Sequence, residues 1–310
     1  MNAATDNTDT TLAIVFPGQG SQAVGMLSEL AASYPLVNET FAQASDVLGY
    51  DLWKLTRDGP EDELNETDRT QPAMLAAGVA VWRVWQQAGG AVPGVMAGHS
   101  LGEYTALVCA GAMDFADAIS LVEQRGRYMQ SAVPAGVGAM AAILGLDDAT
   151  VADVCNRAAA GEVVSPVNFN SPGQVVIAGN ADAVQRAIGL AKEAGAKRAL
   201  PLAVSVPSHC SLMQSAAEQF AERLAQTSIN TPSIPVIQNV DAARHDQPDA
   251  IRENLEKQLY RPVQWVLSVQ NMGSRGLPGL LKPVPERFWR GCANALTSQL
   301  PVQLFLILLL

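Results

Sequence analysis

Two glycines bracket a serine in the segment Gly98-His99-Ser100-Leu101-Gly102. A short apolar run precedes this segment and a helix-forming run follows it, which is the strand–turn–helix context of a nucleophile elbow. Glycine at both outer positions removes the side chains that would collide in so tight a turn. The N–H groups at the start of the following helix can then stabilise an oxyanion beside Ser100. The pattern predicts a serine that carries an acyl group, although a plain Gly-Ser turn has the same letters.

The three histidines of the chain are the candidates for a general base. The ring of His99 cannot easily reach the hydroxyl next to it in the turn, and His245 lies in a polar run that we expect to face solvent. His209 lies between a loop and a helix, a position suited to facing a cleft, so elimination favours it. No Asp or Glu after the elbow is a convincing third member, so we expect a backbone carbonyl or an amide to orient the ring.

Two arginines and a glutamine are further candidates for the site. Arg125 and Arg127 lie in a helix predicted over 115–130, with Asp114 as its N-cap. Two solvated arginines are the ordinary interpretation, and the alternative is that one of them binds a carboxylate with its bidentate fork; spacing leaves both open. Gln19 follows an apolar strand over 12–16, where open α/β sheets bind ligands, but it could simply cap the next helix.

Short apolar strands and amphipathic helices alternate around these residues, which predicts an α/β fold with a mostly parallel sheet covered by helices. Between 135 and 205 the order becomes strand, helix, strand, strand, helix, strand, which is the ferredoxin-like order. We therefore expect a small subdomain at 135–205, inserted in a large domain of residues 12–134 and 206–310, with residues 1–11 disordered. The other predicted elements are helices over 35–48, 70–88, 147–160, 180–195, 211–226 and 249–260, and strands over 139–146, 163–169, 174–178, 197–204 and 235–240.

Composition limits the class of protein. The 310 residues are 48% hydrophobic and 16% charged, which fits a compact enzyme with a substantial core. A net charge of −10 and a pI near 4.8 argue against nucleic-acid binding but leave room for a basic patch that receives an acidic partner. The apolar run 302–310 is far shorter than the about 20 residues of a membrane span. Four scattered cysteines predict no zinc site and no disulfide framework, and favour a reducing cytoplasm.

Several stretches together resemble the malonyl-CoA:acyl carrier protein transacylases of bacterial fatty-acid synthesis. They follow the family's order from residue 12 to about 276 without a gap. The stretches are Phe16-Pro17-Gly18-Gln19-Gly20-Ser21-Gln22, Thr70-Gln71-Pro72-Ala73, Gly98-His99-Ser100-Leu101-Gly102-Glu103-Tyr104, Arg125-Gly126, Asn168-Phe169-Asn170-Ser171-Pro172-Gly173-Gln174, Val206-Pro207-Ser208-His209 and Pro262-Val263-Gln264-Trp265.

This resemblance implies an α/β-hydrolase-like large domain with a ferredoxin-like insert. It implies that Ser100 takes a malonyl group from malonyl-CoA as an ester, with His209 as acid and base. The phosphopantetheine thiol of acyl carrier protein then attacks that ester, which divides one acyl transfer into two easier steps. The coenzyme A thioester is the substrate, so no cofactor or metal is expected, and we expect a monomer.

The same resemblance assigns roles to the other site residues. Arg125 pairs with the malonyl carboxylate, and the backbone N–H groups of Gln19 and Leu101 form the oxyanion hole. The carbonyl of Gln258 orients the ring of the general base, which fits the missing acid. Asn168 and Asn170 line the cleft.

Three alternatives remain open from the sequence. A serine esterase or thioesterase would share the elbow but send the acyl group to water. A malonyl-binding protein, disabled by an altered C-terminus, would share the cleft without the chemistry. An acyltransferase of polyketide synthesis would differ only in its carrier protein, although a freestanding chain favours the fatty-acid role.

The chain departs from the family after about Gly276. The family continues with a strand, Glu-x-Gly-Pro-Gly and a closing helix, whereas residues 277–290 are too rich in proline for that helix. Codons read in a shifted frame from Leu281 onward can encode Glu-Ala-Gly-Pro-Gly-Thr-Val-Leu-Ala-Gly-Leu, the family's segment. We therefore hypothesise a frameshift near residue 276, in the gene or in the reported sequence. A genuine tail would cost the large domain a closing strand and helix and leave an apolar end exposed.

Overall fold

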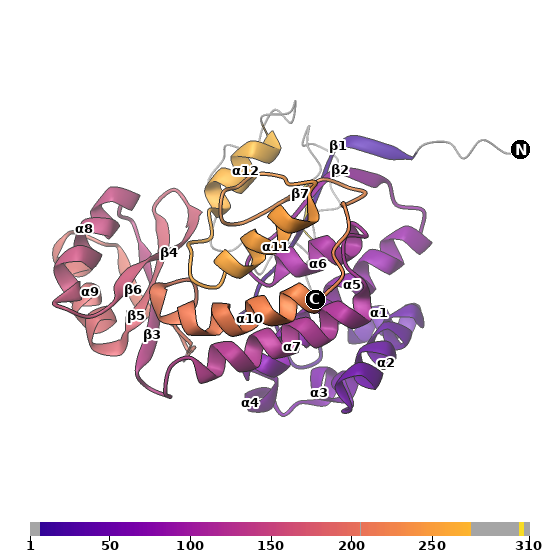
Figure 1. Cartoon of the computed structure of the whole chain (residues 1–310), viewed down its shortest axis with the longest axis horizontal. Coiled ribbons are helices and arrows are strands. Elements are labelled where there is room, and N and C mark those ends of the chain that lie inside the picture. The colour runs from indigo at the N-terminus through magenta and orange to yellow at the C-terminus, as the bar shows by residue number, and fades with distance from the viewer. Residues whose placement is uncertain (1–6, 205, 274–303, 307–310) are drawn as a thin grey trace, which may run out of the picture.

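The computed structural model describes residues 7–204, 206–273 and 304–306. Its larger part is built on a sheet of four strands in the order β7-β2-β1-β8, each paired with its neighbour in parallel (Figure 1). The strands are β1 (Thr8–Phe16), β2 (Val92–Gly98), β7 (Val236–Ile237) and β8 (Leu304–Leu306).

Apolar residues cover both faces of this sheet. Along β1, Leu12, Ile14 and Phe16 belong to the largest hydrophobic core, and the alternating Ala13 and Val15 belong to a smaller core on the opposite face. Successive side chains of a strand point to opposite faces, so burial on both sides explains the continuous apolar run that predicted this strand.

Helices build the two layers around the parallel sheet. The smaller core is covered by α12 (Trp265–Gly273), which contributes Trp265 and Met272. The largest core gathers helices that lie side by side below the sheet in Figure 1. They are α1 (Ser28–Ser33), α2 (Leu36–Leu48), α3 (Leu52–Asp58), α4 (Glu61–Leu64), α5 (Thr67–Gln87), α6 (Gly102–Cys109), α7 (Phe115–Ser131), the 3-10 turn η1 (Ser211–Met213), α10 (Gln214–Gln226) and α11 (Pro248–Lys257).

A second sheet forms the smaller part, at the left of Figure 1, with the order β4-β5-β3-β6 and antiparallel pairs throughout. Its elements are β3 (Gly138–Leu144), α8 (Asp148–Ala159), β4 (Val164–Ser171), β5 (Gln174–Asn180), α9 (Ala181–Glu193) and β6 (Arg198–Pro201). The helices cover one face, and the other face packs against Cys210 of the larger part. The predicted α/β fold class is confirmed, and we propose the domain boundaries at 134/135 and 205/206 on the same grounds.

Four expectations about the elements need correction. Residues 8–11 belong to β1 rather than to a disordered end, because Thr8 and Asp9 pair with Val92 and Pro93 of β2. The strand expected over 235–240 is only two residues long, and the strand expected over 197–204 ends at Pro201. The short helices α1, α3 and α4, and the helix α12, were not predicted from the sequence.

The C-terminal tail lies largely outside the described residues, as do residues 1–6. Within it, Leu304–Leu306 pairs in parallel with β1, so the tail supplies a strand at the edge where we expected one to be lost. Among the helices of the described residues, none is long and apolar enough to cross a membrane. The same residues contain no cluster of three His, Cys, Asp or Glu side chains suited to a metal ion.

Candidate active site

A turn between β2 and α6 places Ser100 at the carboxyl end of the parallel sheet. Its backbone has a positive φ of 51°, which is strained for a residue with a side chain. A Cβ at Gly98 would overlap the carbonyl carbon of Gly102, and a Cβ at Gly102 would overlap the carbonyl oxygen of Phe16. Only glycine therefore fits on either side of the serine, for the steric reason expected from the pattern.

The amide of Asn239 holds the entry to this turn at two points. Its Oδ1 accepts a hydrogen bond from the Ser100 backbone N–H at 2.7 Å, and its Nδ2 donates to the Gly98 carbonyl at 2.7 Å. Asn239 is fully buried, so these bonds form away from water and are costly to lose. The Asn239 side chain therefore stabilises the strained φ of Ser100, and the backbone N–H of Ser100 is already hydrogen-bonded to it.

Ser100 and His209 are joined directly. The distance from Ser100 Oγ to His209 Nε2 is 2.8 Å, and His209 Nδ1 lies 2.6 Å from the backbone carbonyl oxygen of Gln258. Because a carbonyl can only accept, Nδ1 carries the proton, and the neutral ring presents the lone pair of Nε2 to the hydroxyl. Burial, with a contribution from the Arg125 charge, lowers the pKa of His209 to about 3. The ring is thus an unprotonated base, and the expected backbone partner is in place.

Arg125 is buried, with 1% of its surface exposed, and it reaches the same serine. Its Nη1 donates to Gln71 Oε1 at 2.9 Å and its Nη2 to Gln258 Oε1 at 3.0 Å. Nη2 also lies 3.5 Å from Ser100 Oγ. Among the described residues no carboxylate forms an ion pair with this guanidinium. Its partners are neutral groups, which include the ring of Tyr104 at 5.3 Å from the guanidinium carbon to the ring centroid, and a buried positive charge in neutral surroundings favours an anionic ligand.

The neighbouring arginine on α7 behaves differently. Arg127 keeps 50% of its side chain exposed and pairs with Glu123 and Asp68. Spacing left the two arginines equivalent, and the tertiary structure separates them into one solvated residue and one that enters the site.

A cavity of about 280 Å³ opens between the two parts of the chain, with Ser100, His209 and Arg125 in its wall. Gln19, Leu101, Asn168 and Asn170 also line it, so the structure gathers the predicted cleft residues in one place. Within the described residues, the backbone N–H groups of Gln19 and Leu101 donate to no protein acceptor. The side chains of Leu202, Val204 and Val206 make part of the wall apolar.

The two asparagines and the remaining histidines take individual positions. Asn170 Oδ1 contacts His99 Nε2 at 2.8 Å, so this ring is turned away from the serine as expected. Asn168 lies on β4, nearly buried. His245 is only partly exposed, with its side chain 29% accessible, because its Nε2 lies 2.7 Å from Asp241 Oδ2. Its expected exposure to solvent is therefore wrong in part.

Four groups of the site were missed by sequence reasoning. Gln71 and Glu103 lie within stretches that resemble the family, but no role is predicted for them. Asn239 is not among the predicted site residues, and for Gln258 only the backbone carbonyl, not the side chain, is predicted to take part. Glu103 follows the elbow directly and is fully buried, and an acidic residue inside an otherwise apolar helix was the available signal.

Comparison with known proteins agrees with this geometry. A nucleophile elbow, a buried histidine and a two-part α/β fold are features of serine acyltransferases, and the family model described as "Acyl transferase domain" matches residues 13–275. A malonyl CoA-acyl carrier protein transacylase of Escherichia coli (strain K12) is 60% identical over 291 residues, covering 94% of each chain. The chain belongs to the acyl transferase domain family, among the malonyl CoA-acyl carrier protein transacylases.

Two solved structures extend the comparison. An acyl carrier protein S-malonyltransferase from Vibrio cholerae O1 biovar eltor str. N16961 superposes with a TM-score of 0.85 at 63% identity, covering 86% of this chain and 88% of that one. The other holds a type II PKS acyl-carrier protein in complex with its malonyl-transacylase, with a TM-score of 0.86 at 56% identity, covering 90% and 91%. The family model ends at residue 275, but the alignment with the Escherichia coli (strain K12) transacylase spans 94% of this chain and continues past that residue, so the departure expected after about Gly276 stays a prediction.

Proposed function

We propose that this protein transfers a malonyl group from malonyl-CoA to the phosphopantetheine thiol of an acyl carrier protein, through an ester on Ser100. The observation that best supports this proposal is the position of Arg125. Its buried guanidinium, which has no carboxylate partner among the described residues, lies 3.5 Å from the Ser100 hydroxyl oxygen. An acyl group on that oxygen that bears its own carboxylate would neutralise the guanidinium. The names of the relatives at 60% and 63% identity support the same substrate.

The first half-reaction forms the ester. Ser100 Oγ attacks the thioester carbonyl carbon while its proton passes to His209 Nε2, 2.8 Å away. We assign stabilisation of the oxyanion to the backbone N–H groups of Gln19 and Leu101, two residues that line the cavity. The carbon–sulfur bond then breaks, and the imidazolium returns its proton to the departing coenzyme A sulfur.

The second half-reaction reverses these roles. The carrier's thiol gives its proton to His209 as its sulfur attacks the ester carbonyl, and Ser100 Oγ leaves and recovers the proton. The carbonyl of Gln258 accepts from Nδ1 throughout and stabilises the transient imidazolium. Acid, base and nucleophile are side chains of this chain, so the proposed steps need no cofactor or metal.

Intact-mass measurement tests nucleophile, substrate and folding together. Incubation with malonyl-CoA alone is expected to add one malonyl group to the wild type and none to Ser100→Ala. Subsequent addition of holo acyl carrier protein is expected to move that mass to the carrier. An unmodified wild type, or a malonyl group retained in Ser100→Ala, contradicts the proposal.

The stability of the Ser100 ester in water distinguishes an esterase from a transferase. Steady release of malonate from malonyl-CoA without carrier would favour a hydrolase, whereas a stable ester that waits for the thiol favours the transferase. One similar structure holds a type II PKS acyl-carrier protein in complex with its malonyl-transacylase. We propose a fatty-acid carrier for this chain, and malonyl transfer to holo carriers of the two kinds compares them. We also propose a cytoplasmic monomer, which light scattering after size exclusion tests for its oligomeric state.

A further inference from the structure

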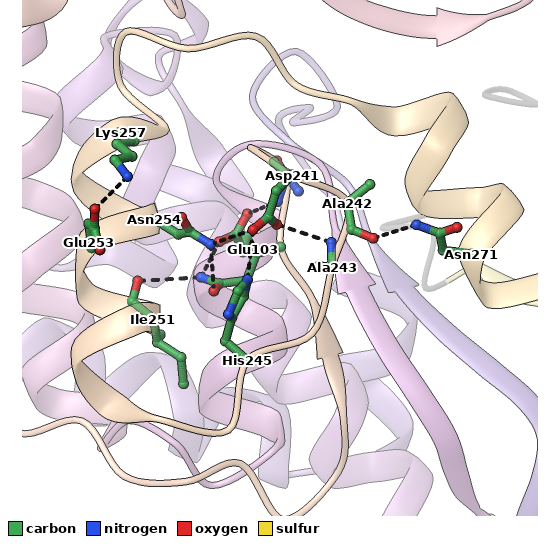
Figure 2. Close-up of polar contacts among 12 residues, drawn as sticks. Glu103, Asp241, Ala242, Ala243, His245, Ile251, Glu253, Asn254, Lys257 and Asn271 are labelled. Atoms are coloured by element: carbon green, nitrogen blue, oxygen red, sulfur yellow. Dashed lines mark hydrogen bonds and ion pairs between the residues drawn. The ribbon is translucent and has the colours of Figure 1, made fainter.

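Glu103, directly behind the elbow, is a buried carboxyl group that the steps above do not use. It lies in the first turn of α6 and has none of its surface exposed. Figure 2 shows it within a polar network that includes Asp241, His245 and Asn254. A buried carboxyl group needs hydrogen-bond partners or a compensating charge to be tolerated.

Three N–H donors converge on this carboxyl group. Its Oε2 accepts from the Asn239 backbone N–H at 2.8 Å and from Gln258 Nε2 at 2.9 Å. Its Oε1 accepts from Gln238 Nε2 at 3.0 Å. Burial raises the pKa of this carboxyl group to about 7, and the three hydrogen bonds act in the opposite direction. No acceptor is among these partners, so the ionised carboxylate, which only accepts, matches the donors, and a carboxyl O–H would have to point at one of them.

The amide orientations in this network are fixed by partners with only one role. Gln258 Oε1 faces the Arg125 guanidinium, which can only donate, and Gln258 Nε2 faces the Ser100 carbonyl at 3.1 Å, which can only accept. The backbone N–H of Asn239 is a donor in any case. The pattern of donors toward Glu103 is therefore set by the chain.

The two partners of Oε2 are the two residues that support the reacting groups. Asn239 holds the backbone of the elbow at the Ser100 N–H and at the Gly98 carbonyl. Gln258 contacts His209 through its carbonyl oxygen and Arg125 through its side-chain oxygen. One carboxylate thus fixes the nucleophile through one partner, and the base and the guanidinium through the other.

The Gln258 amide also stands between two opposite charges. Its Nε2 donates to the Glu103 carboxylate and its Oε1 accepts from the Arg125 guanidinium, an arrangement in which the two hydrogen bonds polarise each other. A direct ion pair would satisfy Arg125 and compete with a substrate carboxylate. One intervening amide compensates the charge and leaves the guanidinium available.

We propose that Glu103 is a positioning residue for acyl transfer, whose ionised carboxylate aligns Ser100 through Asn239 and aligns His209 and Arg125 through Gln258. The inference rests on the proposed function for the role of Arg125. Substitution of Glu103 is expected to slow the chemical step in molecules that are folded. A residue that contributes only to stability would not have this effect.

The test is single-turnover formation of the malonyl ester, followed by intact mass at increasing malonyl-CoA. Glu103→Gln keeps the size of the side chain but turns one oxygen into a donor that faces another donor. We expect the saturating rate constant to fall about 10- to 100-fold, the cost of misaligning reacting groups. The fraction of chains that finally carries the ester and the half-saturating concentration are expected to stay within about threefold.

Glu253→Gln is the matched control, because Glu253 is a carboxylate on nearby α11 whose ion pair, among the described residues, is with exposed Lys257 (Figure 2). Its rate constant is expected to equal that of the wild type. A purely structural role for Glu103 would lower the final esterified fraction and leave the rate constant of the competent molecules unchanged. That result, with a normal wild type, overturns the positioning role alone; a wild type that forms no ester overturns the proposed function instead.

A double-mutant cycle tests whether Glu103 acts on His209 and Arg125 through Gln258. Because rate constants are measured only on the chains that can form the ester, the test still works if one variant folds poorly. Gln258→Met removes the amide but keeps the backbone carbonyl that contacts His209. We expect the Glu103→Gln and Gln258→Met effects to be less than additive in the double variant. Fully additive effects contradict the proposed route.

Discussion

The guanidinium Nη2 of Arg125 lies 3.5 Å from the hydroxyl oxygen of Ser100. Arg125 belongs to α7, whereas Ser100 lies in the turn between β2 and α6. Gln71 and Gln258 fix the guanidinium from two sides, each through a side-chain oxygen. A cation held this rigidly beside a nucleophile selects among acyl groups by charge, because an acyl group without a carboxylate leaves the cation buried and unpaired.

Arg125→Ala is expected to lower the rate of malonyl transfer by at least about 100-fold, the cost of removing one member of a buried charge pair. Acetyl transfer is expected to rise relative to malonyl transfer, because the uncompensated charge is gone. Competition between malonyl-CoA and acetyl-CoA, read by intact mass, measures both. Arg127→Ala on the same helix is the control and is expected to change neither rate by more than about twofold. An unchanged malonyl/acetyl preference in Arg125→Ala would show that this residue is not the clamp.

The pH dependence of the first half-reaction follows from the buried imidazole. Burial first, and then the Arg125 charge, lowers the pKa of His209 to about 3. Only the neutral ring accepts the serine proton, and a lowered pKa keeps the ring neutral as the pH falls. We therefore expect His209 to add no acid limb to kcat/KM for malonyl-CoA from about pH 8 to about pH 5, instead of one near the ordinary value for histidine of about 6.5. The profile is measured in Glu103→Gln, because burial raises the pKa of Glu103 to about 7 and its protonation would fall in the same range. Stopped-flow rates at constant ionic strength check this, and an acid limb centred near pH 6.5 refutes it.

Two glycine substitutions should have opposite effects on stability. Gly98→Ala places a Cβ against the backbone of Gly102 and is expected to lower the free energy of unfolding by about 3 kcal/mol or more. Gly189→Ala, inside α9 with open space around its Cβ, is expected to raise it by up to about 1 kcal/mol. Urea unfolding followed by circular dichroism measures both. Equal stabilities for the two variants would mean that the elbow can widen to admit a side chain.

The C-terminal departure has a direct genetic test. The family match ends at residue 275, and the next codons can encode the family's Glu-Ala-Gly-Pro-Gly segment in another frame. Sequencing of codons 270–285 from genomic DNA is expected to reveal an inserted or deleted base. If the genomic sequence agrees with the reported one and no other frame encodes that segment, the tail is genuine.

Sequence patterns predicted the elements whose causes are local. The apolar run of β1, the N-cap Asp114 of α7 and the strand–helix order of the smaller sheet each depend on neighbouring residues, and the structure has them nearly as expected. The glycines around Ser100 belong to the same group, because the steric conflict they avoid lies mostly within one turn. Short elements were less predictable: β7 is two residues long and is defined by pairing with β2, a partner distant in the chain.

By itself, then, the sequence determined the class of fold, and it predicted the nucleophile and, through elimination and family resemblance, the base and its carbonyl partner. Only the tertiary structure decided that Arg125, and not Arg127, enters the cavity, because burial of a helix face depends on what packs against it. It alone brought Asn239, Gln258 and Glu103 together behind the serine. Hydrogen bonds between residues more than a hundred positions apart leave no periodicity in a sequence, since they are set by the geometry of the folded chain.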